Sequence, residues 1–213
     1  MLIRWRLFFS MLLLTLGQPL SYAEYHSQLP GYATNSRARG AILFMNYCSG
    51  CHSLRYLSWS RMLSDLDLDK RSRMQITPRL YLSLPQLAQT WPDIALAPQD
   101  ATQWFGKPPP DLSLISRQRS TAWVQAYLQG FYPDHLRRFG VNNHQLPNTM
   151  MPNVLESLPG DQHAELADIA YFLAYAAEPA VLIRTHLGWF VLGFLSILTG
   201  LYWLRMRIGP RSL

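Results

Sequence analysis

The stretch Cys48-Ser49-Gly50-Cys51-His52 sets the fold class that we expect for this chain. Two thiols three positions apart, followed at once by an imidazole, are what a c-type haem needs. Each cysteine adds across one vinyl group of the porphyrin, and the histidine binds the iron. The chain has only these 2 cysteines, so no second pair competes as a zinc site and no further cysteine as a disulfide partner. We therefore expect one covalent haem c, bound by Cys48, Cys51 and His52.

A redox dithiol of the thioredoxin type is the alternative use of a Cys-x-x-Cys pair. Such a motif stands beside a strand–helix–strand pattern. This sequence has 15 prolines and is otherwise patterned for helices. A redox dithiol would also give His52 no role, so we favour the haem site.

The length and the charge of the chain limit the classes of function that it can have. A chain of 213 residues allows one medium-sized domain together with membrane segments. The formal charge of +6 is concentrated at the two ends, where Arg4, Arg6, Arg205, Arg207 and Arg211 lie. The remaining 14 Lys and Arg residues nearly balance the 13 Asp and Glu residues. Because the central part is almost neutral, we expect no nucleic-acid partner.

Residues 1–23 have the pattern of a secretory signal peptide. Arg4 and Arg6 supply the positive start, Leu7 to Leu16 the apolar centre, and Ser21-Tyr22-Ala23 a cleavage site. The alternative is a short membrane anchor, for which the apolar centre is short. Export agrees with the cysteines, because bacteria attach haem to this motif outside the cytoplasm.

Leu187 to Leu204 runs for 18 residues without a charge. As a helix this segment is about 27 Å long, close to a hydrocarbon thickness of about 30 Å. Aromatic residues near both ends and arginines directly after it are typical of a membrane span rather than a buried core helix. We expect a single-pass anchor in the inner membrane at 184–206, a periplasmic haem domain at 24–183 and a cytoplasmic tail at 207–213.

Three segments of the central part are patterned as helices. Apolar residues follow helical spacing at 38–54, at 120–129 and from Asp161 to Ala177. Asp161 can cap the last helix, and Glu178-Pro179 ends it. Gly40 is either a helix breaker or the point where the first and last helices cross closely.

The segment from 55 to 110 has no clear periodicity. A mixed charge run at 65–73 is typical of a solvated face, and prolines from 78 to 110 divide the rest into short pieces. We expect this segment to wrap around the haem. The expected fold is mainly α: a class I cytochrome c-like haem domain with long wrapping loops, followed by one transmembrane helix.

A loop rich in Pro, Asn and Gly follows residue 130 and reaches Met150 and Met151. Low-spin haem with histidine on one side commonly takes a methionine thioether on the other, which raises the reduction potential. The other methionines lie in the leader, after the uncharged segment that ends at Leu204, on the helix of the histidine, or by the charge run: Met1, Met11, Met206, Met45, Met62 and Met74. Met150 and Met151 therefore remain as distal ligands, with a gap-filling role in the core as the alternative.

Further motifs accompany the haem stretch. In chain order they are Arg39-Gly40, Cys48 to Leu54, Trp104-Phe105-Gly106, Pro109-Pro110-Asp111-Leu112-Ser113, Arg117, Arg119, Trp123, Tyr127-Leu128, Gly130-Phe131-Tyr132, Asn142-Asn143, Met151 to Leu155 and Ala177-Glu178-Pro179. With a C-terminal anchor, this series resembles the cytochrome c1 family, the haem subunits of the ubiquinol-cytochrome c reductase (cytochrome bc1) complex, in its compact gammaproteobacterial-like form. The resemblance runs from about Arg39 to the end. The haem motif is common to all c-type cytochromes, whereas Pro-Pro-Asp-Leu-Ser, Met-Pro and Ala-Glu-Pro distinguish this family.

The resemblance implies the site residues. Cys48 and Cys51 form thioethers with the haem, and His52 is the proximal ligand. Met151, directly before a proline as in the family, is the distal ligand, with Met150 as the fallback. Arg119 stands where the family places an arginine on a haem propionate, which a guanidinium would stabilise. The alternative for Arg119 is an exposed arginine at a helix start.

The resemblance also implies a function. The protein would accept single electrons from the Rieske iron-sulfur protein and pass them to a periplasmic cytochrome c, as a subunit of an oxidoreductase complex and without catalytic chemistry of its own. The implied partners are cytochrome b, the Rieske protein, a soluble or membrane-bound cytochrome c and the lipid bilayer, within a dimeric complex. Some family members dock a basic cytochrome c through acidic segments. This chain is short there and nearly neutral, so the resemblance does not identify its acceptor.

Two other functions are compatible with a c-type haem. A free-standing, membrane-anchored electron shuttle is one, although the link from Pro179 to His186 is short for a mobile carrier. A haem peroxidase or gas sensor with a displaceable ligand is the other, and no feature of the sequence favours it.

Overall fold

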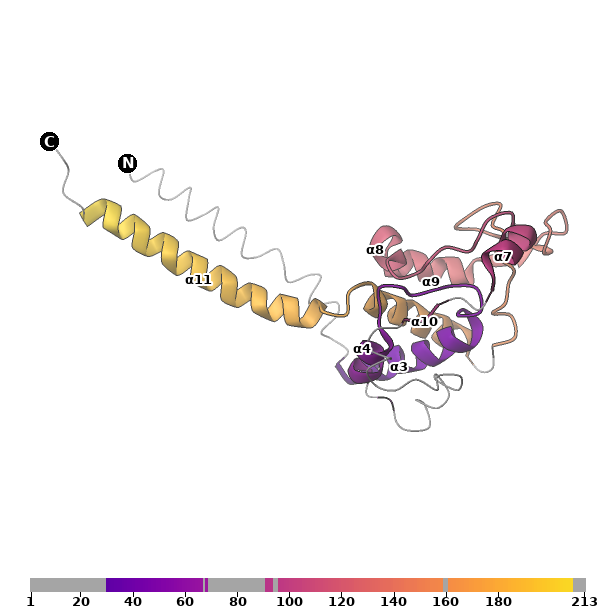
Figure 1. The fold of residues 1–213 in the computed structure, drawn as a ribbon, viewed down its shortest axis with the longest axis horizontal. Helices are drawn as coiled ribbons and strands as arrows, with labels where there is room; N and C mark the ends of the chain where they lie inside the picture. Colours follow the sequence, from indigo (N-terminus) through magenta and orange to yellow (C-terminus); the bar gives the residue numbers. More distant parts are fainter. Residues whose placement is uncertain (1–29, 67, 69–90, 94–95, 159–160, 209–213) are drawn as a thin grey trace.

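The structure is a computed structural model that describes residues 30–66, 68, 91–93, 96–158 and 161–208. The predicted signal peptide at 1–23, most of the charge run and the end of the predicted tail lie outside these residues. The elements are α3 (Pro30–Tyr47), α4 (Trp59–Asp65), α7 (Pro98–Phe105), α8 (Ile115–Arg119), α9 (Thr121–Gln129), β1 (Phe131–Pro133), β2 (Val141–Asn143), α10 (Gln162–Ala177) and α11 (Val181–Ile208). The prediction of a mainly helical domain with a C-terminal apolar helix is confirmed (Figure 1).

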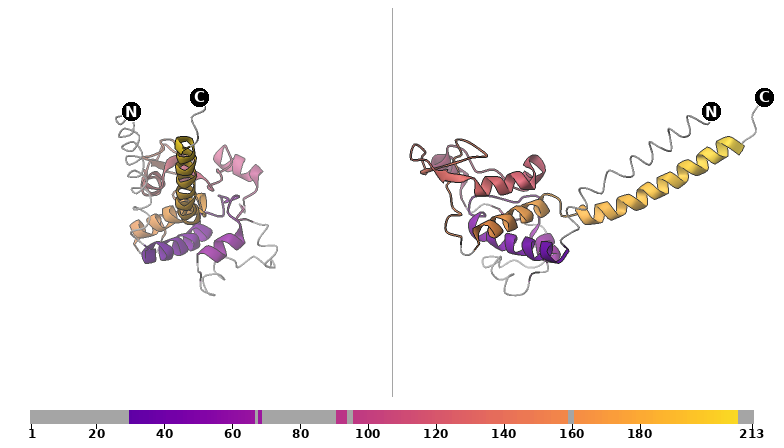
Figure 2. Two further views of the ribbon diagram at one scale, coloured as in Figure 1. Left: turned by 90° about the vertical axis from the view of Figure 1, so that its left-hand side faces the viewer. Right: turned by 180° about the vertical axis from the view of Figure 1, so that it is seen from behind.

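Helices α3 and α10 pack against each other at the centre of the domain (Figures 1 and 2). Gly40 lies where they cross. A Cβ added there would overlap the Asp168 carbonyl oxygen and would stand 2.6 Å from the carbonyl carbon and 2.8 Å from Cβ of Phe172. Of the two interpretations of Gly40, the structure therefore supports the close crossing.

A buried carboxylate fixes the register of this crossing. Asp168 on α10 is 4% exposed, and it accepts hydrogen bonds from the Ser36 hydroxyl and from Arg39 on α3. Arg39 Nε lies 2.6 Å from Oδ2 of Asp168, and Nη2 lies 3.0 Å from Oδ1. Because a two-point guanidinium contact has one geometry, it holds the helices in a single alignment.

Helices α8 and α9 cover the other side of α10 (Figures 1 and 2). Ser120 joins them with φ 82°, and its Oγ accepts a hydrogen bond from Trp123 N at 3.2 Å. This side-chain cap starts α9 where the sequence predicts a helix. The following loop contains a hairpin that the sequence did not predict, in which β1 and β2 pair antiparallel with Phe131 opposite Asn143. Strands of three residues are too short to show a period of two.

Helix α10 has the predicted ends. The Asp161 carboxylate accepts from the backbone N–H groups of His163 and Ala164, which satisfies donors that lack a partner inside the helix. The prediction for the first helix, over 38–54, is wrong at both ends. The backbone N–H groups of Cys48 and Ser49 both donate to the Phe44 carbonyl, at 2.8 and 3.0 Å, so the helix closes before the cysteines.

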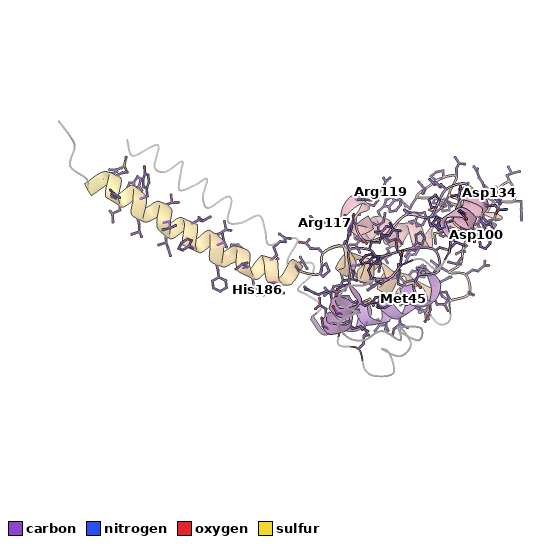
Figure 3. The ribbon with its side chains drawn as sticks, viewed as in Figure 1. Met45, Asp100, Arg117, Arg119, Asp134 and His186 are labelled. Carbon is purple, nitrogen blue, oxygen red and sulfur yellow. The ribbon has the colours of Figure 1, made fainter. Side chains whose placement is uncertain are left out.

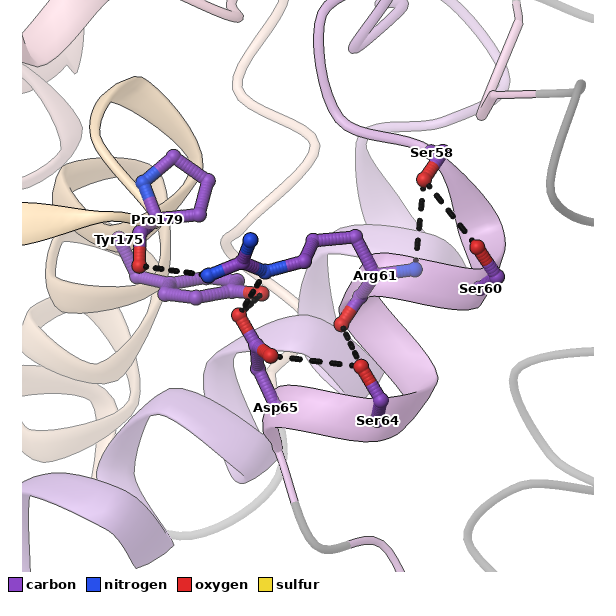
Figure 4. A network of polar contacts seen from close by, with 7 residues as sticks. All are labelled: Ser58, Ser60, Arg61, Ser64, Asp65, Tyr175 and Pro179. Atoms are coloured by element: carbon purple, nitrogen blue, oxygen red, sulfur yellow. Dashed lines mark hydrogen bonds and ion pairs between the residues drawn. The ribbon is translucent and has the colours of Figure 1, made fainter. Parts of the chain in front are cut away.

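Polar contacts tie α4 to the end of α10 (Figure 4). Arg61 Nε lies 2.5 Å from Oδ2 of Asp65, which also accepts a hydrogen bond from the Tyr175 hydroxyl at 3.0 Å. Arg61 Nη2 donates to the Pro179 carbonyl at 3.2 Å. Helix α4 thus holds the residues between α10 and α11 against the domain.

Helix α11 leaves the domain from this corner and extends away from it (Figure 1). Ile183–Arg207 is long and apolar enough to cross a bilayer, and none of its most apolar window is buried within the chain. At the junction, the Glu178 carboxylate pairs with Arg117 of α8 and with Arg184 of α11, each at 2.6 Å. We call these three residues the Glu178 clamp.

Candidate haem-binding site

The two cysteines and His52 lie in a compact turn at the end of α3. Cys51 N and His52 N both donate to the Cys48 carbonyl, at 3.0 and 2.8 Å. Cys48 is 7% exposed and belongs to the hydrophobic core, whereas Cys51 and His52 are half-buried. The turn therefore brings both thiols and the imidazole to one end of the helix, with one thiol turned into the core.

The ring of His52 has a defined orientation. Its Nδ1 lies 2.8 Å from the Pro110 carbonyl oxygen. A carbonyl oxygen can only accept, so Nδ1 carries the proton and Nε2 keeps a free lone pair. Burial lowers the pKa of His52, while the Pro110 hydrogen bond and the charge of Asp111 oppose this in part. The imidazole is therefore neutral, the form that binds a metal.

The backbone around His52 is held by Asp111 and its neighbours. The Asp111 carboxylate accepts from the Ser53 hydroxyl at 2.6 Å, from Arg55 N at 3.0 Å and from Ser113 N at 2.9 Å. Leu112 N donates to the Ser53 carbonyl at 3.0 Å. The segment that supplies Pro110 to His52 is thus fixed to the residues just after the histidine.

Met151 lies in the loop between β2 and α10 and is half-buried. Its Sδ accepts a hydrogen bond from the Tyr127 hydroxyl of α9 at 3.5 Å. The same hydroxyl lies 2.9 Å from Oγ1 of Thr149, which accepts from Met151 N at 3.3 Å. Burial raises the pKa of Tyr127, and its hydrogen bond with Thr149 opposes this in part.

The other methionines have different settings. Met62 is fully buried in the core, and Met45 packs against that core from α3 (Figure 3). Met74 lies outside the described residues. Met150 is half-buried beside Met151.

Arg119 is exposed and ends α8, so it does not start a helix (Figure 3). Its guanidinium carbon lies 5.3 Å from the ring centroid of Trp123 on α9. Trp123 in turn stacks on Tyr127, with centroids 5.4 Å apart and planes 12° apart. Through Trp123, Arg119 thus lies on the same side of the domain as Tyr127, whose hydroxyl contacts Met151.

Comparison with known proteins defines the family. Residues 24–209 match the model of the Cytochrome C1 family. The chain belongs to the cytochrome c1 family. It is 37% identical to cytochrome c1 of Allochromatium vinosum over 195 residues, covering 76% of this chain and 78% of that protein. It is 30% identical to the ammonia monooxygenase gamma subunit of Nitrosomonas europaea (79% and 80% covered) and 30% identical to cytochrome c1 of Blastochloris viridis (76% and 76% covered). The expected resemblance is confirmed, and membership implies electron transport by a haem protein.

The donor groups fit the covalent haem c that membership of the cytochrome c1 family implies. Both cysteines are free thiols. Burial raises the pKa of Cys48 to about 12, with nearby Cys51 adding to the rise, and burial also raises the pKa of Cys51. Redox dithiols instead have a lowered pKa, often at a helix N-terminus, whereas these thiols follow the C-terminus of α3. With Nε2 of His52 and a thioether sulfur also present, the set suits haem ligation better than thiol exchange.

Three residues of the candidate site, Asp111, Tyr127 and Thr149, did not emerge as functional from the sequence. Asp111 and Tyr127 stood only within family motifs, and Thr149 carried no signal of its own. The Asp111 carboxylate bonds Ser53, which is 58 positions away, and the Tyr127 hydroxyl bonds Thr149, which is 22 positions away. Such a pairing has no local pattern that would reveal it.

Acid is expected to loosen the loop around His52 through Asp111. Burial raises the pKa of Asp111, but hydrogen bonds from Ser113, Ser53 and Arg55 outweigh it, so the pKa is lowered overall. The stability from this carboxylate is therefore present above its unfolded pKa of about 3.9 and is lost as pH falls through the folded value. Thermal unfolding of the full chain in detergent should show a smaller loss of stability below about pH 4 in Asp111→Asn than in the wild type. The exposed Glu156→Gln serves as a control that keeps the wild-type profile.

Proposed function

We propose that this chain is the electron-transfer subunit of a respiratory cytochrome bc1 complex. It would pass single electrons from the Rieske iron-sulfur protein to a periplasmic cytochrome c through one covalent haem c. Membership of the cytochrome c1 family supports this role. The observation that carries the proposal is the hydrogen bond from Nδ1 of His52 to Pro110, because it leaves Nε2 as a ready ligand directly beside two free thiols.

Each residue of the site has a part. Cys48 and Cys51 would hold the group by thioether bonds, and His52 and Met151 would bind its iron. When bound, haem c supplies a one-electron ferric/ferrous couple. Pro110 and Asp111 keep the imidazole in one tautomer and one orientation. Arg119 would pair with a propionate; the contact of its guanidinium with Trp123, which stacks on Tyr127 beside Met151, supports this role. With both residues bound to the iron, no position on it would be left for a substrate.

The apolar helix α11 supports a proposal for the membrane arrangement. A helix of this length and composition suits a single-pass anchor in the inner membrane. Arg205 and Arg207 lie in its last turn, and positive residues remain on the cytoplasmic side. The haem domain would then face the periplasm and the C-terminus the cytoplasm.

A free-standing electron shuttle is the alternative function. The short link between α10 and α11 argues against it. Only residues 178–180 separate α10 from α11, and from within this link Glu178 pairs with Arg117 of α8 and Arg184 of α11. A mobile carrier needs a longer, flexible link. The short junction instead suits a subunit with fixed partners.

Purification of the tagged full chain from membranes in mild detergent tests the proposal. We expect a reduced-minus-oxidised spectrum of low-spin haem c, haem that stays attached in a denaturing gel, and co-purification of cytochrome b and the Rieske protein. Cys48→Ser combined with Cys51→Ser should abolish the attached haem. A colourless chain whose two thiols can be alkylated would overturn the haem site. Recovery without cytochrome b would favour the shuttle, and recovery with a monooxygenase would favour the role named for the Nitrosomonas relative.

A further inference from the structure

We propose that Tyr127 and Thr149 are positioning residues that aim the Met151 sulfur and raise the reduction potential of the site. The inference rests on the proposed function, in which Met151 is an axial ligand. The supporting observation is a closed ring of three hydrogen bonds that joins the side chain and the backbone of Met151 through two hydroxyl groups.

The donors and acceptors of this ring can be assigned by counting. Thr149 Oγ1 accepts from Met151 N at 3.3 Å, so its own proton is free to donate. The contact between the Thr149 and Tyr127 hydroxyls, at 2.9 Å, allows either to donate. Tyr127 has one proton, and the thioether sulfur has none. Since the sulfur can only accept, Tyr127 donates to Met151 Sδ at 3.5 Å and Thr149 donates to Tyr127.

Both hydroxyl groups are held from outside the ring. Tyr127 stacks on Trp123, and its ring meets that of Phe131 edge-on, each with centroids 5.4 Å apart. Its backbone carbonyl accepts from Nδ2 of the fully buried Asn143 at 2.7 Å. Thr149 is 8% exposed, and the residue before it is fixed by a hydrogen bond from its N–H to Asn142 Oδ1 at 2.8 Å. The Tyr127 hydroxyl group is therefore held in the position from which it donates its proton to Met151 Sδ.

The consequence for an iron ligand follows from electrostatics. A thioether sulfur has two lone pairs, so it can bind iron with one and accept the Tyr127 proton with the other. The hydrogen bond places the positive end of an O–H dipole at the ligand and withdraws electron density from it. Both effects disfavour the ferric charge relative to the ferrous, so the hydrogen bond raises the potential.

Redox titration of the purified holoprotein tests this role with Tyr127→Phe, which removes one oxygen atom and keeps the stacked ring. We expect a lower reduction potential, together with retention of the far-red absorption band that reports ligation of ferric haem by methionine sulfur. Thr149→Val should shift the potential in the same direction, and it should cause no further shift in the Tyr127→Phe background, because Thr149 acts through the Tyr127 proton. Tyr132→Phe, on the neighbouring strand β1, is the matched control and should keep the wild-type potential.

The outcomes separate this inference from the proposed function. An unchanged potential in Tyr127→Phe, with the band intact, overturns the role of Tyr127 and leaves the ligand assignment standing. Shifts of Tyr127→Phe and Thr149→Val that simply add overturn the relay through Thr149. If the wild-type protein itself lacks the band, Met151 is no ligand, and the proposed site fails together with the inference.

Discussion

Met151→Leu is expected to lower the reduction potential sharply or to open the iron to added ligands. Leucine has nearly the same volume as methionine but no lone pair, so the loop keeps its packing and loses the sulfur. Axial ligands set haem potentials over a wide range, so a shift on the order of 100 mV or more is expected. Redox titration and the binding of carbon monoxide to the reduced protein would measure the two effects.

Met150→Leu is the matched control, because it makes the same change one residue away in the same loop. Tyr127 contacts the sulfur of Met151, so Met150→Leu should keep a low-spin spectrum and a nearly unchanged potential. The opposite pattern, in which Met150→Leu loses the low-spin spectrum while Met151→Leu keeps it, would reassign the ligand to Met150.

Gly40→Ala should destabilise the haem domain by about 3 kcal/mol or more, because the added methyl group overlaps backbone atoms of α10 that cannot move without parting the helices. In an open helix the same substitution stabilises by up to about 1 kcal/mol. The expected loss of stability in Gly40→Ala therefore comes entirely from the crossing with α10. Denaturant unfolding, followed by the loss of helix signal, measures the change.

Gly188→Ala is the control for this effect. Gly188 also lies inside a helix, but among the described residues a Cβ added there meets no atom within 4 Å beyond its chain neighbours and the backbone of its own helix. We expect Gly188→Ala to leave the stability of the haem domain as it is. Equal stability of Gly40→Ala and the wild type would contradict the close crossing of α3 and α10.

The sequence predicted those parts of the fold that depend on neighbouring residues. The cap at Asp161 and the stop at Glu178-Pro179 act within one helical turn, and both occur as predicted. The end of the first helix was placed wrongly because the apolar stripe continues into the turn that holds Cys48. The hairpin at Phe131 was missed because three residues carry no period.

The candidate site likewise contains residues that are close in sequence, which could be predicted, and residues that are distant in sequence, which could not. Cys48, Cys51 and His52 lie within five consecutive positions, so their spacing alone identifies the chemistry. The groups that orient His52 and Met151 come from distant parts of the chain and emerged only from the folded arrangement. The assignment of Met151 stays a prediction, now with a hydrogen-bonded sulfur as its physical basis.

The Glu178 clamp limits how far the haem domain can move relative to helix α11. Single exposed ion pairs contribute little, but here one carboxylate, in the three-residue link before α11, pairs with arginines of both α8 and α11, and the link also contains a proline. We expect the height and tilt of the domain above the bilayer to be set when the protein folds. An electron donor that exchanges with this subunit from a more distant site must then cover that distance itself.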